Sequence, residues 1–397
     1  HHCGYIMRIA LVIVVVAVVA AACAGSQTEP QGPGRLVIID DAGNIATLAP
    51  DGSELAASTD DVGGRITYFQ PMWSPDGSHL GVTRADADGF SIEILDVETG
   101  EQTSTTTTSN SFYSYWSPDG SQLAYLSSVT PTDLALDVIS VEAADLPERL
   151  GLGQPFYFSW NPDSAEVVAH VGADRLEILG SEPASPELPP PGDFPSPQWT
   201  EQGILHVGIG GGRQRLMLTQ PDGETESIAS LSGGAVFTAT ADGEQIAILP
   251  TGGDDIGSTV AALQVPLLPA GRLLIVDSGG DEFVEVDVEL AVAFFWDPTR
   301  TRLLILEFTE AGAFRWKVWE DAETTTFPDF VPAPGLLRDL VPFFDQYAQS
   351  MTLWSPDGSA FVYPGALDGE DGIWVQELTG ADPRRIAGGS WVAWSSG

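Results

Sequence analysis

The chain has 397 residues, and its 56 acidic residues against 16 basic ones give a formal net charge of −40. A field of this sign repels nucleic acid and anionic lipid headgroups, so we expect neither as a direct partner. We interpret the excess as a solvated acidic surface. Capture of a cation or a cationic partner is the alternative.

The first residues are typical of an export signal. Met7 and Arg8 precede an apolar run, 9–22, that is short for a membrane span. The run ends in Ala20-Ala21-Ala22-Cys23-Ala24-Gly25-Ser26, which resembles the lipobox of bacterial lipoproteins. That resemblance implies that Cys23 carries a diacylglyceryl anchor; an ordinary signal peptide with an incidental cysteine is the alternative. We therefore assign 1–23 to upstream residues plus a signal peptide and 24–35 to a flexible tether.

One phrase recurs along the rest of the chain. Trp73-Ser74-Pro75-Asp76-Gly77-Ser78 returns at 116–121 and at 354–359, with looser copies at 160–163 and 296–299. Pro presets φ, Asp bonds its own backbone and Gly accepts positive φ, so each copy predicts a strand end, a tight turn and a second strand. The repeat residues are accordingly assigned a structural role in the turns: Trp73, Asp76, Trp116, Asp119, Trp160, Asp163, Trp296, Trp354, Asp357 and Trp394.

The spacing of the copies predicts the fold class. They follow one another at intervals of roughly 40 residues, with a degenerate copy at 239–243, which is the length of a four-stranded propeller blade. No amphipathic helix separates them. We therefore expect an all-β β-propeller of four-stranded antiparallel blades. Eight blades is the preferred number and seven the alternative, because two long intervals could hide a misassigned strand.

The two ends of the repeat region complement each other. The segments 36–40, 44–48 and 53–57 are three strands without a first one, whereas 391–397 stops at its turn and lacks a second strand. We expect the C-terminal strand to pair into the N-terminal blade and close the ring, which removes exposed edges. On this interpretation 36–397 is a single domain. It contains no cysteine, so burial alone must stabilise it.

At these residues the chain resembles the WD40-like β-propeller repeats of the periplasmic protein TolB and its bacterial relatives, among them the propeller domains of prolyl oligopeptidase-type enzymes. The resemblance rests on the Trp-Ser-Pro-Asp-Gly phrase and extends over 36–397. We find neither the α/β domain that precedes the TolB propeller nor the α/β-hydrolase domain of the peptidases. The resemblance therefore implies the fold and leaves the function open.

Three segments depart from a minimal blade, and loops on a rigid scaffold often carry binding residues. The segment 182–197 is rich in proline and cannot form a ladder, 252–269 extends a hairpin, and 327–350 is the largest insertion. Within the last, Phe343, Phe344, Asp345, Gln346 and Tyr347 are our candidate contact with a partner or ligand. Aromatic packing that anchors the insertion is the alternative.

The sequence encodes no evident catalytic constellation. His79 sits beside a turn, and His170 and His206 fall in strands that we place at blade edges. The acidic turns 86–89 and 368–372 resemble Ca²⁺-binding loops in their alternating carboxylates, but they lack the length and the distal Glu of an EF-hand. We therefore predict no metal or other cofactor, with Ca²⁺ as the one alternative.

These observations predict a monomeric, lipid-anchored lipoprotein outside the cytoplasm, at the cell surface or in the periplasm. We expect a non-enzymatic binding or scaffold module for an envelope protein or glycan, which touches the membrane through its anchor only. The alternative is an extracytoplasmic hydrolase or lyase whose active site lies on the propeller axis.

Overall fold

The computed structural model describes residues 33–396, apart from 64, 108–109, 143–146, 173, 181–187, 193–194, 252–266, 269–270 and 281. The export signal with Cys23, most of the expected tether at 24–35 and most of the 252–269 insertion lie outside the described residues. The described part belongs to one compact unit, Gly32–Gly397. Within it, no helix is long and apolar enough to cross a membrane.

The first sheet combines both ends of the chain. It consists of β1 (Leu36–Ile39), β2 (Ile45–Leu48), β3 (Ala56–Ala57) and the last strand, β31 (Trp391–Trp394). The order is β3-β2-β1-β31, and β31 pairs antiparallel with β1 from Leu36↔Trp394 to Ile39↔Trp391.

The next three sheets follow the chain in order. The second contains β4 (Thr67–Trp73), β5 (His79–Ala85), β6 (Phe90–Asp96) and β7 (Gln102–Thr107). The third contains β8 (Ser111–Trp116), β9 (Gln122–Thr130), β10 (Asp133–Ser140) and β11 (Glu148–Gly153). The fourth has three described strands, β12 (Phe156–Trp160), β13 (Val167–Val171) and β14 (Arg175–Leu179).

Proline explains why the described part of the fourth sheet stops at three strands. Pro189, Pro190 and Pro191 follow β14 in the chain and have no backbone N–H to donate to a ladder. The described residues of this stretch pair instead with the next sheet, where Gly192 N donates to the carbonyl of Val207 at 2.9 Å.

The remaining sheets complete the strand set. The fifth contains β15 (Gln198–Thr200), β16 (Gly203–Gly210), β17 (Arg213–Thr219) and β18 (Thr225–Leu231), with β21 (Leu267–Leu268) parallel at its edge. The sixth contains β19 (Gly234–Ala239), β20 (Gln245–Thr251), β22 (Leu274–Asp277) and β23 (Phe283–Glu285). The last has seven strands, β24 (Ala291–Trp296), β25 (Leu303–Phe308), β26 (Phe314–Glu320), β27 (Glu323–Pro332), β28 (Ala360–Leu367), β29 (Glu370–Glu377) and β30 (Arg384–Ala387).

The seven-stranded sheet is two sets of strands joined at a short junction. β27 and β28 pair only at Val331↔Ala366 and Pro332↔Gly365. The first strand of the second set is reduced to a bridge, Trp354↔Phe361. β24–β27 and β28–β30 therefore each correspond to one unit of the repeat.

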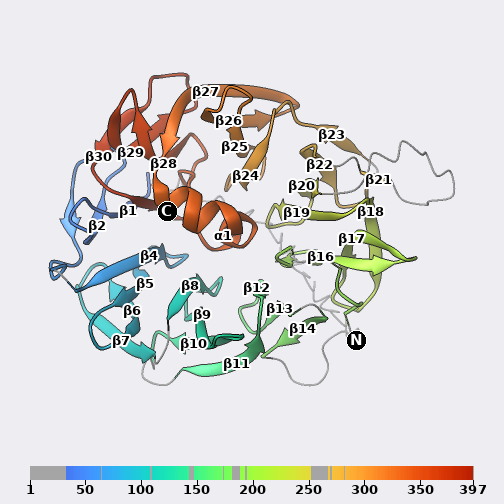
Figure 1. Ribbon diagram of the computed structural model, residues 1–397, viewed down its shortest axis with the longest axis horizontal. Coiled ribbons are helices and arrows are strands. Elements are labelled where there is room, and N and C mark those ends of the chain that lie inside the picture. Colours follow the sequence, from blue (N-terminus) through green and yellow to red (C-terminus); the bar gives the residue numbers. More distant parts are fainter. Residues whose placement is uncertain are drawn as a thin grey trace, which may run out of the picture. The chain divides into compact units, whose positions relative to one another are not determined.

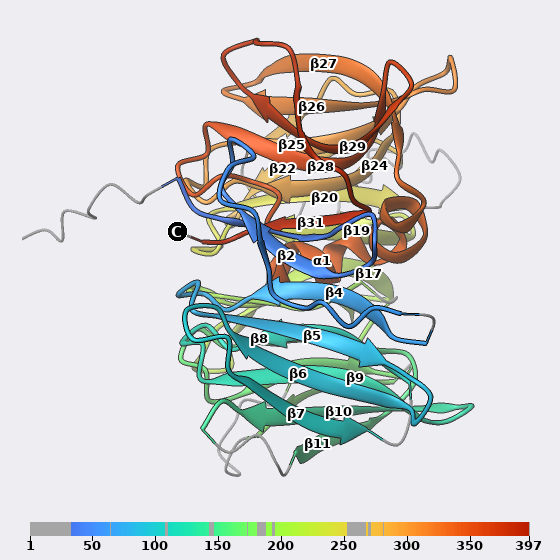
Figure 2. The ribbon, with the colours of Figure 1, turned by 90° about the vertical axis from the view of Figure 1, so that its left-hand side faces the viewer.

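The sheets are arranged around a common centre. Figure 1 shows β4, β8, β12, β19 and β24 turned toward it, with β7, β11, β14 and β23 at the periphery. In the side view, β4 to β7 lie side by side as one twisted blade (Figure 2). Burial follows this order, because every residue of β13 is buried whereas β23 is exposed throughout. The described part is a β-propeller, which confirms the predicted all-β architecture of antiparallel blades.

The repeat phrase forms the expected turns. In its second copy Ser117 Oγ donates to Asp119 Oδ1 at 2.7 Å, and the backbone N of Ser121 donates to the same carboxylate at 3.0 Å. Gly120 has φ +71°, a conformation that glycine adopts without strain. The hydrogen bonds from Ser117 and Ser121 hold the pKa of Asp119 below its usual range. Asp119 is thus a turn residue, as the sequence predicts.

The repeat tryptophans connect neighbouring sheets. Trp116 Nε1 donates to the carbonyl of Met72 at 3.1 Å, and Trp160 Nε1 to that of Tyr115 at 3.0 Å. Trp296 and Trp354 do the same toward Thr238 and Phe295, at 3.0 and 3.1 Å. Each of these bonds runs from the first strand of one unit to that of the unit before it. The phrase therefore fixes the contact between units as well as the turn.

Antiparallel order gives the propeller two distinct faces. The turn face carries the connections from first to second and from third to fourth strands, including every copy of the repeat turn. The opposite face carries the connections from second to third strands and from each sheet to the next. We call it the insertion face, because the segment between β27 and Trp354 lies there.

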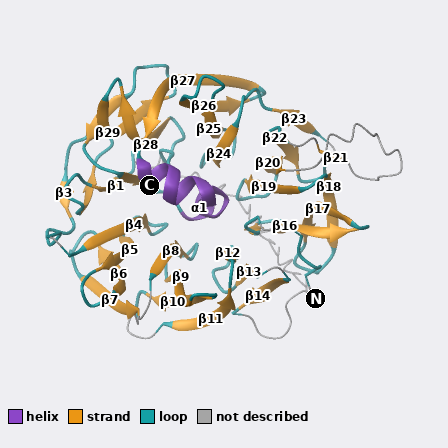
Figure 3. Cartoon of the chain, in the orientation of Figure 1, coloured by secondary structure: helices purple, strands orange, loops and turns teal. Residues whose placement is uncertain are grey.

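The insertion is shorter than predicted and is helical. Residues 327–332, assigned to it from the sequence, belong to β27, where Phe327 and Phe330 are buried. The insertion proper contains the π-helix η1 (Leu336–Leu340), the 3₁₀ helix η2 (Val341–Phe343) and the α-helix α1 (Phe344–Ser350). Figure 3 shows α1 as the helix across the centre of the strands.

Candidate functional site

The insertion places α1 on the axis. α1 contacts β8, β12, β19 and β24, which are the first strands of four sheets (Figure 1). Four of the five candidate residues face this core, because Phe344, Asp345, Gln346 and Tyr347 are between 3% and 5% exposed. Phe343 differs, with 46% of its surface exposed.

Gln346 bonds α1 to two strands. Its Nε2 donates to the carbonyl of Phe158 at 2.6 Å and to Tyr113 Oη at 2.8 Å. Its Oε1 accepts from the backbone N of Phe158 at 2.9 Å and from Ser196 Oγ at 3.1 Å. Both ends of the amide are thus satisfied within the core, which fixes the helix against β8 and β12.

Asp345 is a buried carboxyl group with few partners. Its Oδ2 accepts from the backbone N of Ser196 at 2.9 Å, and its Oδ1 from the N of Gln346 at 3.1 Å. Burial raises the pKa of Asp345 to about 6, and these two bonds only partly oppose the effect.

The aromatic members of the cluster pack in edge-to-face pairs. Phe344 lies 4.6 Å from Phe294 between ring centroids, and Tyr347 lies 5.0 Å from Tyr113. Such pairs stabilise beyond the area they bury. Phe344 and Tyr347 therefore anchor the insertion, and Phe343 is the member that a partner can reach.

A cavity of about 450 Å³ opens beside the insertion and is mostly apolar. β8, β9 and β12 supply one wall, and η1, η2 and α1 the other. Its size is in the range of small-molecule and side-chain pockets. Its lining includes Gln70, Phe112, Tyr113, Gln154, Phe156, Tyr157, Arg338, Asp339, Phe343 and Gln346.

Two residues of the lining have unusual backbone conformations. Gln70 has φ +48° and Tyr113 φ +50°, in the left-handed region that residues other than glycine seldom adopt. Each lies at a shift in register within the first strand of its sheet. The two are joined, because the backbone N of Tyr113 donates to Gln70 Oε1 at 3.1 Å. Strain of this kind is concentrated at functional sites.

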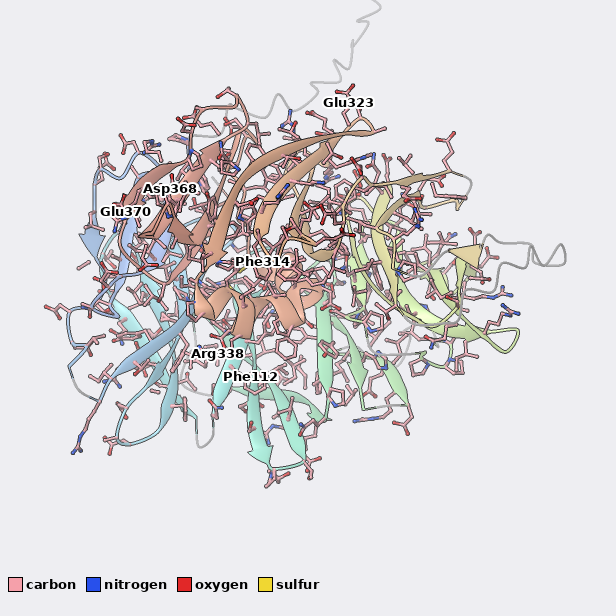
Figure 4. The ribbon with its side chains drawn as sticks, turned by 45° about the horizontal axis from the view of Figure 1, so that its top comes forward. Phe112, Phe314, Glu323, Arg338, Asp368 and Glu370 are labelled. Carbon is pink, nitrogen blue, oxygen red and sulfur yellow. The ribbon has the colours of Figure 1, made fainter. Side chains whose placement is uncertain are left out.

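The mouth of the cavity combines one ion pair with apolar side chains. Arg338 holds Asp339 through two bonds of 2.6 Å, and its own side chain is 74% exposed. Figure 4 shows Arg338 near Phe112, whereas Asp368 and Glu370 lie away from it on the propeller. Phe343 of the insertion lines the cavity and is exposed. The site thus offers an apolar pocket with a paired charge at its entrance.

The other predicted candidates do not join this site. His170 and His206 lie in β13 and β16, the second strands of their sheets, and not at blade edges; each is 2% exposed. Burial lowers the pKa of His206 to about 4. Asp86 is bound by Arg84 and by the backbone of Asp88, as in a polar turn. Among the described residues, no group of three or more His, Cys, Asp or Glu is placed to hold a metal ion.

The sequence did not reveal most of the cavity. Gln70 and Tyr113 each lie three residues before a repeat tryptophan, so a position within the repeat could have found them. Gln154 and Tyr157 carry no signal in the sequence. They meet the insertion only because the sheets, arranged around a common centre, bring distant units together.

Comparisons with known proteins support the fold. The sequence matches no protein-family model and none of the curated proteins compared with it. A solved eukaryotic initiation factor matches 92% of this chain over 99% of its own, at 12% identity and a TM-score of 0.54. A prolyl endopeptidase matches 83% of this chain over 50% of its own, at 11% identity and a TM-score of 0.50. TolB from Acinetobacter baumannii is also similar, covering 92% of this chain and 81% of its own, at 11% identity and a TM-score of 0.42. At these identities the likeness concerns the fold alone.

Proposed function

We propose that the chain is a non-enzymatic binding module of the cell envelope, and that the cavity on its insertion face holds the partner. The observation that carries the proposal is the pocket itself. It is apolar, strained at Gln70 and Tyr113, and rimmed by the exposed side chain of Phe343. An exposed apolar rim around an apolar pocket is typical of binding surfaces.

A protein partner fits this cavity better than a glycan. A sugar presents hydroxyl groups in every direction, and a mostly apolar lining would leave many of them without hydrogen bonds. An aromatic or aliphatic side chain of a partner protein would instead be buried fully, as anchor residues of interfaces are. The exposed Arg338–Asp339 pair at the mouth would contact the polar rim around such an anchor.

The lining favours binding over hydrolysis or elimination. Asp339 is the only carboxylate that lines the cavity among the described residues, and Arg338 already binds it. A glycosidase needs two carboxyl groups on either side of the bond it cleaves, and an acyl hydrolase needs a nucleophile with a base. The described lining contains no histidine or cysteine.

The wider organisation is part of the same proposal. We infer eight blades, with the seven-stranded sheet counted as two, and a ring closed by β31. The module is monomeric and is held outside the cytoplasm by a lipid on Cys23, its only contact with the membrane. Replacing Cys23 with Ser should release the protein from membranes, and fractionation measures this. Unchanged membrane retention would contradict the anchor.

Site-specific photo-crosslinking tests the binding site. A benzophenone side chain in place of Phe343 should cross-link one stoichiometric envelope protein in the source cell. The matched control is Phe283 of β23. The Phe283 side chain is 52% exposed, and β23 lies at the periphery of the propeller (Figure 1). Phe343→Ala should weaken co-purification of that partner at least tenfold, whereas Phe283→Ala should not. Identical products at 343 and 283, or none at 343, would contradict the proposal.

A further inference from the structure

A second cavity, of about 300 Å³, lies on the turn face. Its walls are the turn-face ends of β8, β12, β15, β19 and β24, and Ala348 and Gln349 of α1 line it as well. It is thus separate from the cavity beside the insertion, whose α1 residues are Gln346 and Tyr347. The function proposed above makes no use of it.

Trp199 of β15 lines this cavity, and it differs from the four tryptophans that tie first strands together. Trp116, Trp160, Trp296 and Trp354 donate their indole N–H to the unit before them. In β15 the contact to the preceding unit is made by the backbone instead, because Trp199 N donates to Ser159 Oγ at 2.9 Å. Among the described hydrogen bonds, none involves the indole of Trp199, which is partly exposed. Its N–H is therefore available to a ligand.

Two further residues of the lining have a polar atom without a hydrogen-bond partner among the described residues. Gln349 donates through Nε2 to Ser196 Oγ at 3.0 Å, and its amide oxygen accepts no hydrogen bond among those described. Thr238 is 2% exposed, and its hydroxyl has no partner within the described structure. That hydroxyl oxygen is enclosed by the protein, so the amide oxygen of Gln349 is the acceptor that a ligand can reach.

The one charged side chain among the described lining residues, Glu201, is already held in an ion pair. Glu201 binds Arg300 at 3.0 Å, and Arg300 also binds Asp242 at 3.0 Å. The cavity therefore offers a donor on Trp199 and an acceptor on Gln349. A ligand that fits must supply both an acceptor and a donor, and the two carboxylates that share Arg300 oppose an anion. The overall charge of −40 also opposes an anion.

The cavity lining also contains the aromatic faces of two tryptophans. Trp199 and Trp296 line the cavity and are both partly exposed. A pyranose ring presents a face of C–H groups that packs on an indole, while its hydroxyl groups both donate and accept at the ring edge. The volume lies at the small end of ligand pockets, which suits a sugar residue rather than a folded partner. We propose that the turn-face cavity is a binding site for a neutral sugar residue, stacked on Trp199 and bonded by its indole N–H and Gln349.

Saturation-transfer NMR on the full soluble chain with Cys23→Ser tests this site. The probes are the methyl glycosides of glucose, galactose, mannose and N-acetylglucosamine, with methyl glucuronoside as the anionic comparison. At least one neutral glycoside should bind saturably, and the glucuronoside at least tenfold more weakly. Trp199→Ala should weaken binding at least tenfold and Gln349→Ala at least threefold, while Phe283→Ala should leave it unchanged.

The variants are interpretable only if they fold, so each is compared with the parent by thermal unfolding. Trp199→Phe retains a stacking ring without the N–H, and it should give an intermediate affinity. The proposal is overturned if no neutral glycoside binds the parent chain at 100-fold excess, or if binding survives Trp199→Ala unchanged. Saturable binding of a decaproline peptide, with no glycoside bound, would overturn it in favour of a polypeptide ligand.

Discussion

At the scale of single residues, buried carboxyl groups make the stability of this protein depend on pH. Asp345 has a pKa of about 6 in the fold against 3.8 for the free side chain, because burial disfavours its charged form. The stability it contributes is fully present below pH 3.8 and is lost as the pH rises through about 6. Over that window the loss amounts to about 3 kcal/mol.

Asp345→Asn should remove this dependence. The amide oxygen can still accept the hydrogen bond from the backbone N of Ser196. We expect the variant to gain up to about 3 kcal/mol relative to the parent between pH 4 and pH 7, measured by urea unfolding. Glu93, whose pKa burial raises to about 7, remains in the variant, so part of the pH dependence persists. A constant difference at both pH values would contradict the assignment, and Asp88→Asn, an exposed carboxyl, is the control.

The repeat tryptophans allow a matched comparison. Trp296 and Trp199 are both partly exposed and both lie in a first strand, but only Trp296 donates its indole N–H to the preceding unit. Trp296→Phe should therefore cost about 1–3 kcal/mol more than Trp199→Phe, because it leaves the carbonyl of Thr238 without its partner. Chemical unfolding of both variants measures the difference. Equal losses would show that ring volume alone matters.

At the scale of elements, α1 depends on one side chain for much of its attachment. Gln346→Ala would leave the N–H and carbonyl of Phe158 and the hydroxyl of Tyr113 without these partners inside the core. We expect a loss of about 3–5 kcal/mol, and faster hydrogen exchange at the backbone N of Phe158. Arg338→Ala, on the exposed part of the same insertion, should change stability by less than about 0.5 kcal/mol. Unchanged exchange at Phe158 would contradict the role of Gln346.

Local elements were predictable and their meeting points were not. The turn at Ser117–Ser121 is specified by side chains that bond within five residues, so its sequence is sufficient to recognise it. The boundary at 327–332 was wrong because Pro328 and Pro332 argue against a strand, yet Phe327 and Phe330 are buried in β27. The cavity joins Gln70, Tyr113 and Phe343, and only the arrangement of the sheets around a common centre brings these together.

At the scale of the whole molecule, the point where the tether enters the propeller sets how the protein would lie on a membrane. Trp394 Nε1 donates to the carbonyl of Pro33 at 2.9 Å, and Arg35 and Ser395 exchange bonds of 2.9 and 2.8 Å. Ser395 follows the last repeat tryptophan and therefore lies at the turn face, and these bonds hold Pro33 and Arg35 beside it. If Cys23 carries the lipid, Pro33 is ten positions along the chain from the anchor, a reach of about 35 Å at most.

The turn face should therefore lie toward the membrane and the insertion face away from it, with the cavity beside the insertion open to partners. Glu98 and Asp88 flank β6 at its turn-face and insertion-face ends, and both are exposed. Energy transfer from a dye on Glu98→Cys to an acceptor lipid should exceed that from Asp88→Cys, because β6 holds the two sites apart by about 3.4 Å per residue. Both signals should vanish when Cys23 is replaced by Ser. Equal transfer from the two positions in the anchored protein would contradict this orientation, and with it the expectation that partners approach the insertion face from outside.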